Sequence, residues 1–296
     1  MAVLLPRVKA RMSIHAHRKV RGLLEGDYAA LHAGRSMDFN DLREYVRGDD
    51  VKDIDWKASA RSRTLLVKRY AALRQHTIQL VVSTGRSMAA LNELDMPKRD
   101  LAVTAAGVIG WIAVRHGDLV ALAWGDADEQ HHNPPVRGEL GLERHLQSIH
   151  DASTPEAGAS DLPALLEYVV RTVRRRTLLF VVSDVREVDD RTAAALRRLS
   201  VQHEVLFVTV GDLDPTSDDL VTEEIVDVDS GQLLPEWLRG DEELQREYAD
   251  LLVADARAMK HRLDSLGVVH VHVPDERTTI RAMFDLLETH RHARRR

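Results

Sequence analysis

The sequence contains no cysteine, and only 4% of its residues are aromatic. Without cysteine there are no disulfides and no thiolate metal sites, which suits the reducing cytoplasm where we expect the protein to act. The scarcity of aromatic side chains leaves Ala, Val and Leu as the main core residues. Such a composition favours an α/β protein with aliphatic layers.

Long hydrophobic runs are also lacking. The stretch from Leu101 to Val114 is interrupted by Thr104 and two glycines, and it is shorter than the roughly 20 residues that a membrane span needs. The apolar start, Met1 to Pro6, is too short for the core of a signal peptide. The sequence therefore predicts no membrane span.

Charge of one sign is not in large excess, since the formal net charge is −6. Nothing in this balance indicates nucleic acid as a partner. One local exception is residues 7–24, which carry six Lys/Arg and no acid. They predict a basic helix that packs one side on the domain, or alternatively a weak contact of residues 7–21 with an anionic surface.

From residue 76 onward, apolar runs alternate with helical periods. Strands are expected at 77–82, 118–124, 177–182, 204–210 and 268–273, and helices at 98–115, 138–150, 161–174, 189–200, 241–266 and 276–290. This βα rhythm predicts a mostly parallel sheet with helices on both faces. Two segments are expected outside this rhythm: a loop at His131-His132 and an acidic hairpin insertion at about 212–234, turning at Ser230-Gly231.

The most distinctive stretch is residues 34–70, where many charged residues surround few apolar ones. Gly48-Asp49-Asp50 predicts a turn, and residues 65–67 predict a short strand. Ile54 and Trp56 are expected to anchor the segment by burial.

This stretch resembles the signature of a bacterial family, domain of unknown function fifty-eight. The matching pieces are Asp38-Phe39, Leu42-Arg43-Glu44-Tyr45, Gly48-Asp49-Asp50, Ile54-Asp55-Trp56, Ser59-Ala60-Arg61 and Val67-Lys68. The resemblance implies a von Willebrand factor A-like domain at 76–296, preceded by a family-specific extension at 1–75 whose strand pairs onto or covers a sheet edge. It also implies a non-enzymatic protein-interaction adaptor that works beside a MoxR-type AAA+ ATPase.

The same resemblance implies a metal-ion-dependent adhesion site, which in A domains combines an Asp-x-Ser-x-Ser loop, a Thr or Ser and a distal Asp. Ser87 matches the last serine, Ser160 the threonine and Asp184 the distal aspartate, whereas Ser83 and Gly85 replace the first Asp and the middle Ser. Because a hard cation prefers charged oxygen ligands, we expect Mg²⁺ binding to be weak or absent. Ser83→Asp together with Gly85→Ser is expected to restore it.

An enzyme is the rival interpretation. The cluster Asp49, Asp50, Asp53 and Asp55 predicts, on this alternative, a metal-dependent hydrolase. Ion pairs with Arg43 or Arg61 explain the same carboxylates as structural groups, and we favour that reading. The sequence shows no nucleophile elbow and no Walker A loop, so we expect no enzymatic activity.

Overall fold

The structure is a computed structural model that describes residues 3–16, 41–46, 54–62, 64–69, 75–92, 94–215, 225–233, 235 and 241–293. Its centre is a six-stranded sheet in the order β5-β4-β3-β6-β7-β8. The strands are β3 (Thr77–Ser83), β4 (Leu119–Gly125), β5 (Gln130–Val136), β6 (Leu178–Ser183), β7 (Glu204–Val210) and β8 (Val269–Val273). All neighbours run parallel except β4 and β5. The predicted mostly parallel α/β fold is confirmed.

Strands β4, β3 and β6, in the interior of the sheet, are apolar along almost their whole length. Ile78 of β3 lies between Val120 of β4 and Leu178 of β6, and all three side chains are buried. Strands covered on both faces have no need for alternating polar residues, which is why these runs are continuous.

The segment expected as a loop at His131-His132 is instead the antiparallel edge strand β5. The sequence did not predict this strand because it contains Pro134 and Pro135, and proline cannot donate a ladder hydrogen bond. An edge strand tolerates proline, since one side of its backbone has no partner strand. The ring of His131 stacks on Trp124 of β4, with 4.2 Å between the ring centroids.

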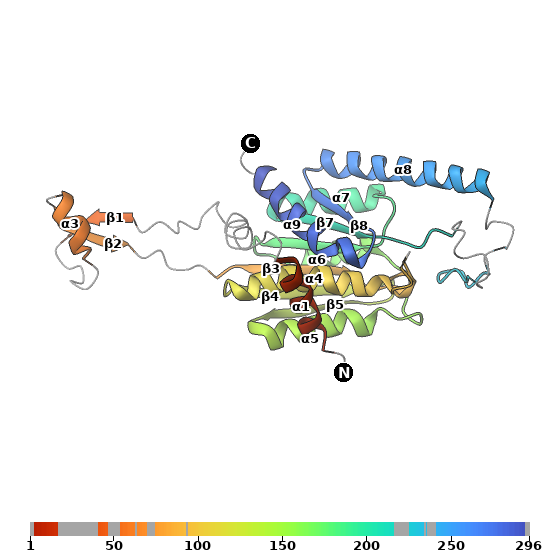
Figure 1. Cartoon of the computed structure of the whole chain (residues 1–296), viewed down its shortest axis with the longest axis horizontal. Coiled ribbons are helices and arrows are strands. Elements are labelled where there is room, and N and C mark those ends of the chain that lie inside the picture. Colours follow the sequence, from red (N-terminus) through yellow and green to blue (C-terminus); the bar gives the residue numbers. More distant parts are fainter. Residues whose placement is uncertain are drawn as a thin grey trace.

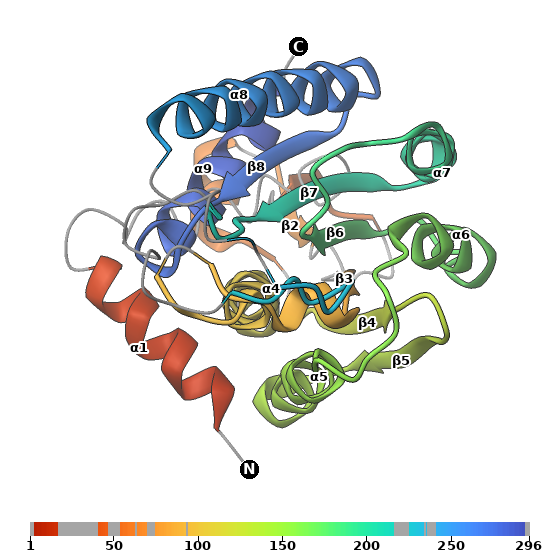
Figure 2. The ribbon, with the colours of Figure 1, turned by 90° about the vertical axis from the view of Figure 1, so that its right-hand side faces the viewer.

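Helices cover both faces of the sheet, and Figure 2 shows the resulting three layers. One face carries α1 (Leu4–Ala16), α4 (Lys98–Arg115), α5 (Gly138–Ala152) and α9 (Glu276–Ala293). The other carries α6 (Leu162–Thr172), α7 (Asp190–Gln202) and α8 (Glu242–Ser265). A short 3₁₀ helix, η2 (Arg86–Ala89), links β3 to the loop before α4.

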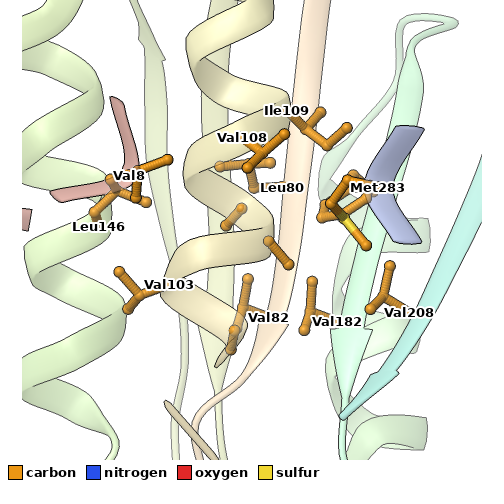
Figure 3. Packing of buried hydrophobic residues seen from close by; sticks show 14 of the residues in the cluster. Val8, Leu80, Val82, Val103, Val108, Ile109, Leu146, Val182, Val208 and Met283 are labelled. Atoms are coloured by element: carbon orange, nitrogen blue, oxygen red, sulfur yellow. The ribbon is translucent and has the colours of Figure 1, made fainter. Parts of the chain in front are cut away.

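Helix α1 packs into the core of the large domain, although the sequence analysis assigned it to the extension. Val8 lies beside Leu146 of α5 and near α4 in the close-up of Figure 3. A Cβ at Gly107 of α4 would come within 2.8 Å of Val8, so glycine permits this close approach. The amides of Leu4 and Leu5 donate to the carboxylate of Glu143 at 2.8 and 2.7 Å. The remainder of the basic stretch, residues 17–24, lies outside the described residues.

The signature segment forms a small unit of its own, which Figure 1 shows apart from the six-stranded sheet. Strand β1 (Asp41–Glu44) pairs antiparallel with β2 (Leu66–Arg69), and α3 (Trp56–Ser62) lies between them in the chain. Of the expectation that this strand pairs onto or covers a sheet edge, the pairing with the six-stranded sheet is therefore wrong. Strand β2 pairs with β1 instead, so both strands of this small sheet come from the signature segment.

Within this unit, Ile54 and Val67 form the apolar centre with 8% and 4% exposure. Trp56 is 63% exposed, so the prediction that it is a buried anchor is wrong. The reason is position: Trp56 opens α3 beside the turn made by Asp55, whereas Ile54 bridges to Val67. Asp49, Asp50, Asp53 and the side chain of Arg43 lie outside the described residues.

Across the described part of the chain, none of the helices combines the length and the apolar character that crossing a membrane requires.

Candidate functional site at the carboxyl edge of the sheet

Three segments meet where β3 and β6 end. The amide of Thr84, just after β3, donates to Gly125 O at the end of β4. The amide of Arg86 donates to Gly158 O, and the amide of Gly158 donates to Asp126 Oδ2 at 2.9 Å. These bonds hold the loop that contains Ser160 against η2 and the β4–β5 turn. Ligands of open α/β sheets collect at such an edge.

The structure brings Ser87 and Ser160 together, with their hydroxyl oxygens 2.6 Å apart. Ser160 precedes Asp161, whose carboxylate caps α6 by accepting from Ala164 N at 2.9 Å. Ser83 ends β3 with 1% exposure, and its hydroxyl has no hydrogen-bond partner among the described residues. The hydroxyl groups at this edge are thus engaged with each other or enclosed.

Asp184, directly after β6, pairs with an ammonium group that the sequence analysis did not single out. The Nζ of Lys98, at the first position of α4, lies 2.8 Å from Asp184 Oδ2, and the two side chains are 3% and 5% exposed. The same Nζ lies 3.3 Å from Asp212 Oδ1, just beyond β7. Burial by itself lowers the pKa of a lysine, but here Asp184 and Asp212 outweigh it and hold the pKa of Lys98 above its ordinary value.

One sequence signal could have identified Lys98. The N-terminus of a helix carries partial positive charge, so a lysine in the first turn is unfavourable unless a carboxylate compensates it. Lys98 opens the helix that its own periodicity predicts, and Asp100 in the same turn is partly exposed. The compensating groups are Asp184 and Asp212, which lie far away in the sequence.

Gly85 cannot be replaced by the serine of the adhesion-site motif. A Cβ at this position would lie 2.5 Å from Ser160 Oγ and 2.6 Å from the Cα and N atoms of Ser160. Two of these atoms are backbone, so the clash cannot be relieved by a rotamer change. This lack of room argues against the Gly85→Ser half of the expected restoration by Ser83→Asp with Gly85→Ser.

The residues at this edge do not fit a divalent cation. Ser83 contributes no charge, Asp184 is already bonded to Lys98, and Ser87 and Ser160 are bonded to each other. Among the residues that the structure describes, no group of three or more His, Asp or Glu side chains is placed to hold a metal. Hard cations need several charged or polar oxygens that are free to turn inward.

Beside the edge lies a cavity of about 520 Å³ between α8 and the ends of β6, β7 and β8. His270 and His272 point into it from alternate positions of β8, and Thr209 Oγ1 lies 2.9 Å from His272 Nδ1. Arg186 joins the cavity to the edge, because its guanidinium lies 3.1 Å from Asp212 Oδ2 and 5.9 Å from the centre of the Tyr248 ring of α8. Lys98, Asp212, Arg186 and Tyr248 thus form a continuous row from α4 to α8.

Comparison with known proteins identifies a family that the sequence matches. The family model described as "Protein of unknown function DUF58" matches residues 41–259. Uncharacterized proteins of Mycobacterium tuberculosis (Rv1480) and Mycobacterium bovis (Mb1516) are each 29% identical over 207 residues, or 69% of this chain. The chain spans 63% of the length of these relatives.

Solved structures similar to the chain include von Willebrand factor A-type domains. A von Willebrand factor type A protein from Catenulispora acidiphila has 10% identity and a TM-score of 0.42, covering 78% of this chain and 44% of its own. An aerotolerance-related membrane protein from Bacteroides fragilis has 13% identity and a TM-score of 0.44, covering 73% of this chain and 98% of its own. These similarities concern the fold.

Proposed function

The chain belongs to the DUF58 family and has an α/β fold with a mostly parallel six-stranded sheet, and from this premise we propose that it is a non-enzymatic protein-interaction adaptor. Its partner is a MoxR-type AAA+ ATPase, as the family resemblance of the signature implies. The binding surface is the carboxyl edge of the sheet around η2, Ser160 and the end of β6.

The observation that carries this proposal is the pairing of polar groups at the edge. Lys98 and Asp184 neutralise each other in a buried ion pair, and Ser87 is hydrogen-bonded to Ser160. A general base or a nucleophile must be able to reach a substrate and exchange a proton with it. Polar side chains that are already paired with one another keep a fixed position. They and the backbone around them form a surface of fixed shape, which suits recognition of a protein partner.

The hydrolase alternative draws no support from the one aspartate of its cluster that the structure describes. Asp55 Oδ1 accepts hydrogen bonds from the amides of Lys57 and Ala58 at 3.1 and 3.0 Å. These are capping bonds at the start of α3, a structural use of the carboxylate. Asp49, Asp50 and Asp53 lie outside the described residues.

Contact of residues 7–21 with an anionic surface is a weaker proposal, because part of this charge is used within the protein. Lys9 lies 2.8 Å from Glu139 and 4.3 Å from the centre of the Trp111 ring. Arg11 pairs with Glu276. Flotation with anionic vesicles at low and moderate salt tests the remaining attraction, which salt should abolish.

The adaptor proposal is tested with two matched surface variants. Leu91 is 42% exposed in the loop between η2 and α4, at the carboxyl edge, whereas Val201 is 87% exposed at the opposite end of the sheet, in the last turn of α7. The purified chain is mixed with a MoxR-type ATPase from the same organism, with and without a non-hydrolysable ATP analogue, and the complex is quantified by gel filtration.

We expect nucleotide-dependent complex formation that Leu91→Arg weakens at least tenfold and Val201→Arg leaves unchanged. A tenfold loss corresponds to about 1.4 kcal/mol, a modest effect for a charge placed in an interface. Absence of a complex with the wild-type chain under both conditions contradicts the partner. Equal behaviour of the two variants contradicts the assignment of the surface.

A further inference from the structure

We propose that Lys98 is the resident cation of the carboxyl edge: its ammonium group holds the charge that a divalent ion supplies in adhesion-type sites, so that this edge works without metal. Only groups of this chain take part in this arrangement. Its consequence for partner binding, which is insensitivity to chelators, rests on the proposed adaptor function.

The charges at the edge form an alternating row. Asp184, Lys98, Asp212 and Arg186 follow one another with nitrogen–oxygen distances of 2.8, 3.3 and 3.1 Å. Two carboxylates therefore meet two cationic side chains, and the row is neutral. A divalent cation needs uncompensated negative charge to offset the loss of its hydration shell. Within this row, neither carboxylate is left without a cationic partner.

The position of Lys98 is fixed by its helix. Its amide donates to Ala90 O at 2.9 Å, and the residues of α4 that follow, from Leu101 to Ala106, are all buried. The helix cannot slide or turn without disrupting that packing. The ammonium is consequently held beside Asp184 by the core, and an incoming ion would have to displace a side chain that is 3% exposed.

Stability alone does not account for this ion pair. Removing two charges from water carries a desolvation penalty that the attraction between them often only balances, and apolar residues of similar volume do as well or better. Here a lysine stands at the unfavourable end of the helix dipole. Its partner, Asp184, is the residue that the resemblance identifies as the distal aspartate of a metal site. Replacement of the ion by Lys98 explains both features.

Divalent-cation titration of three proteins tests the proposal. They are the wild type, Lys98→Ala, and Lys98→Ala combined with Asp184→Asn. Calorimetry with Mg²⁺ and with Mn²⁺ gives the affinity, and melting temperatures in chelator and in excess cation give an independent readout. Circular dichroism establishes that each variant is folded.

The wild type should show no saturable binding and the same melting temperature with chelator as with cation. Lys98→Ala leaves Asp184 without its buried partner, so it should melt lower in chelator and regain stability with Mn²⁺. It should also bind Mn²⁺ saturably, at least tenfold more tightly than the detection limit at which the wild type shows no binding. The double variant should lose this binding. Methylammonium, a small cation of the lysine type, should also stabilise Lys98→Ala, whereas sodium at equal ionic strength should not.

Saturable Mg²⁺ binding by the wild type would overturn the proposal, as would a folded Lys98→Ala that gains neither metal binding nor methylammonium stabilisation. Should Lys98→Ala not fold, the double variant decides: its folding supports a charge-compensating role for Lys98, and its failure contradicts that role. No ATPase is needed for these measurements, so they are independent of the partner proposal.

Discussion

Helices α4 and α8 both start at the carboxyl edge of the same sheet, yet they are buried to very different extents. From Leu101 to Ala113, α4 exposes little more than Trp111, because it is enclosed by the sheet, by its neighbours α5 and α9 in the same layer, and by α1. Helix α8 is longer, at 24 residues against 18, and only Leu263 in its last turns is buried. The cavity lies beneath the rest of its inner face.

Composition follows this difference. Helix α4 is rich in Ala, Val and Ile and has two glycines that admit Val8 and Leu142. Helix α8 is charged on most of its surface, with only a narrow stripe that includes Leu252 and Met259 toward the cavity. Elements with few buried apolar contacts open at the lowest free energy. We therefore expect α4 to unfold only with the whole domain and α8 to open locally.

The largest effect is expected from cavity formation in α4. Ile109→Ala removes a side chain that is 1% exposed, and such a deletion typically lowers the free energy of unfolding by about 2–5 kcal/mol. Leu251→Ala on α8, where the side chain is 54% exposed, is the matched control and should change it by less than about 0.5 kcal/mol. Urea unfolding of both variants gives the comparison. Similar losses would show that α8 is packed more tightly than its exposure indicates.

A smaller effect is expected from loss of a helix cap. The carboxylate of Asp241 accepts from the amides of Glu243 and Leu244 at 2.9 and 3.2 Å, and caps of this kind contribute about 0.5–2 kcal/mol. Asp241→Ala should speed amide exchange in the first turns of α8 and leave the melting temperature nearly unchanged. Asp189→Ala removes the equivalent cap of α7, whose Thr192 is buried, and should lower the melting temperature instead. A global effect of both would contradict local opening.

Acid should destabilise the protein through histidines whose pKa the fold lowers. Burial lowers the pKa of His145 below its ordinary value of 6.5, against a hydrogen bond to Val120 O that raises it. Desolvation by the cavity walls likewise lowers the pKa of His272, although this residue is exposed on the side of the cavity under α8. As pH falls through about 6.5, these histidines bind protons in the unfolded chain before they do so in the folded chain, where their pKa values are lower. The free energy of unfolding therefore decreases.

Melting temperatures between about pH 7.5 and 5.5 measure this effect, in the range where histidine normally titrates. His145→Gln should flatten the profile more than His272→Gln, since the side chain of His145 is 2% exposed and has no water to receive its charge. The opposite order would indicate that the cavity under α8 is closed to water.

The smallest effect is expected outside the large domain. Trp56→Ala removes a side chain that is 63% exposed and should change stability by less than about 0.5 kcal/mol. Ile54→Ala, at 8% exposure, should instead speed amide exchange across β1 and β2. Collisional quenching of fluorescence provides a second check, because an exposed Trp56 is accessible to iodide. Strong destabilisation by Trp56→Ala would mean that the ring is covered.

Local patterns in the sequence were sufficient for most elements of the large domain. The predicted helix at 98–115 coincides with α4, and the predicted strand at 204–210 coincides with β7. The turn at Ser230-Gly231 is also present, with Gly231 at φ +68°. Helical and strand periods are set by neighbouring residues, so they can be read without knowledge of the fold. The family signature is local in the same sense.

Tertiary structure alone decided which residues meet. Lys98 and Asp184 are 86 positions apart, and no periodicity links them. The lack of room at Gly85 depends on the approach of the Ser160 backbone, and the docking of α1 depends on Glu143 and Gly107. The sequence by itself determined the α/β layers and which loops lie at the carboxyl edge of the sheet. The pairing of a lysine with the distal aspartate was decided by the fold, because charge compensation acts through space and not along the chain.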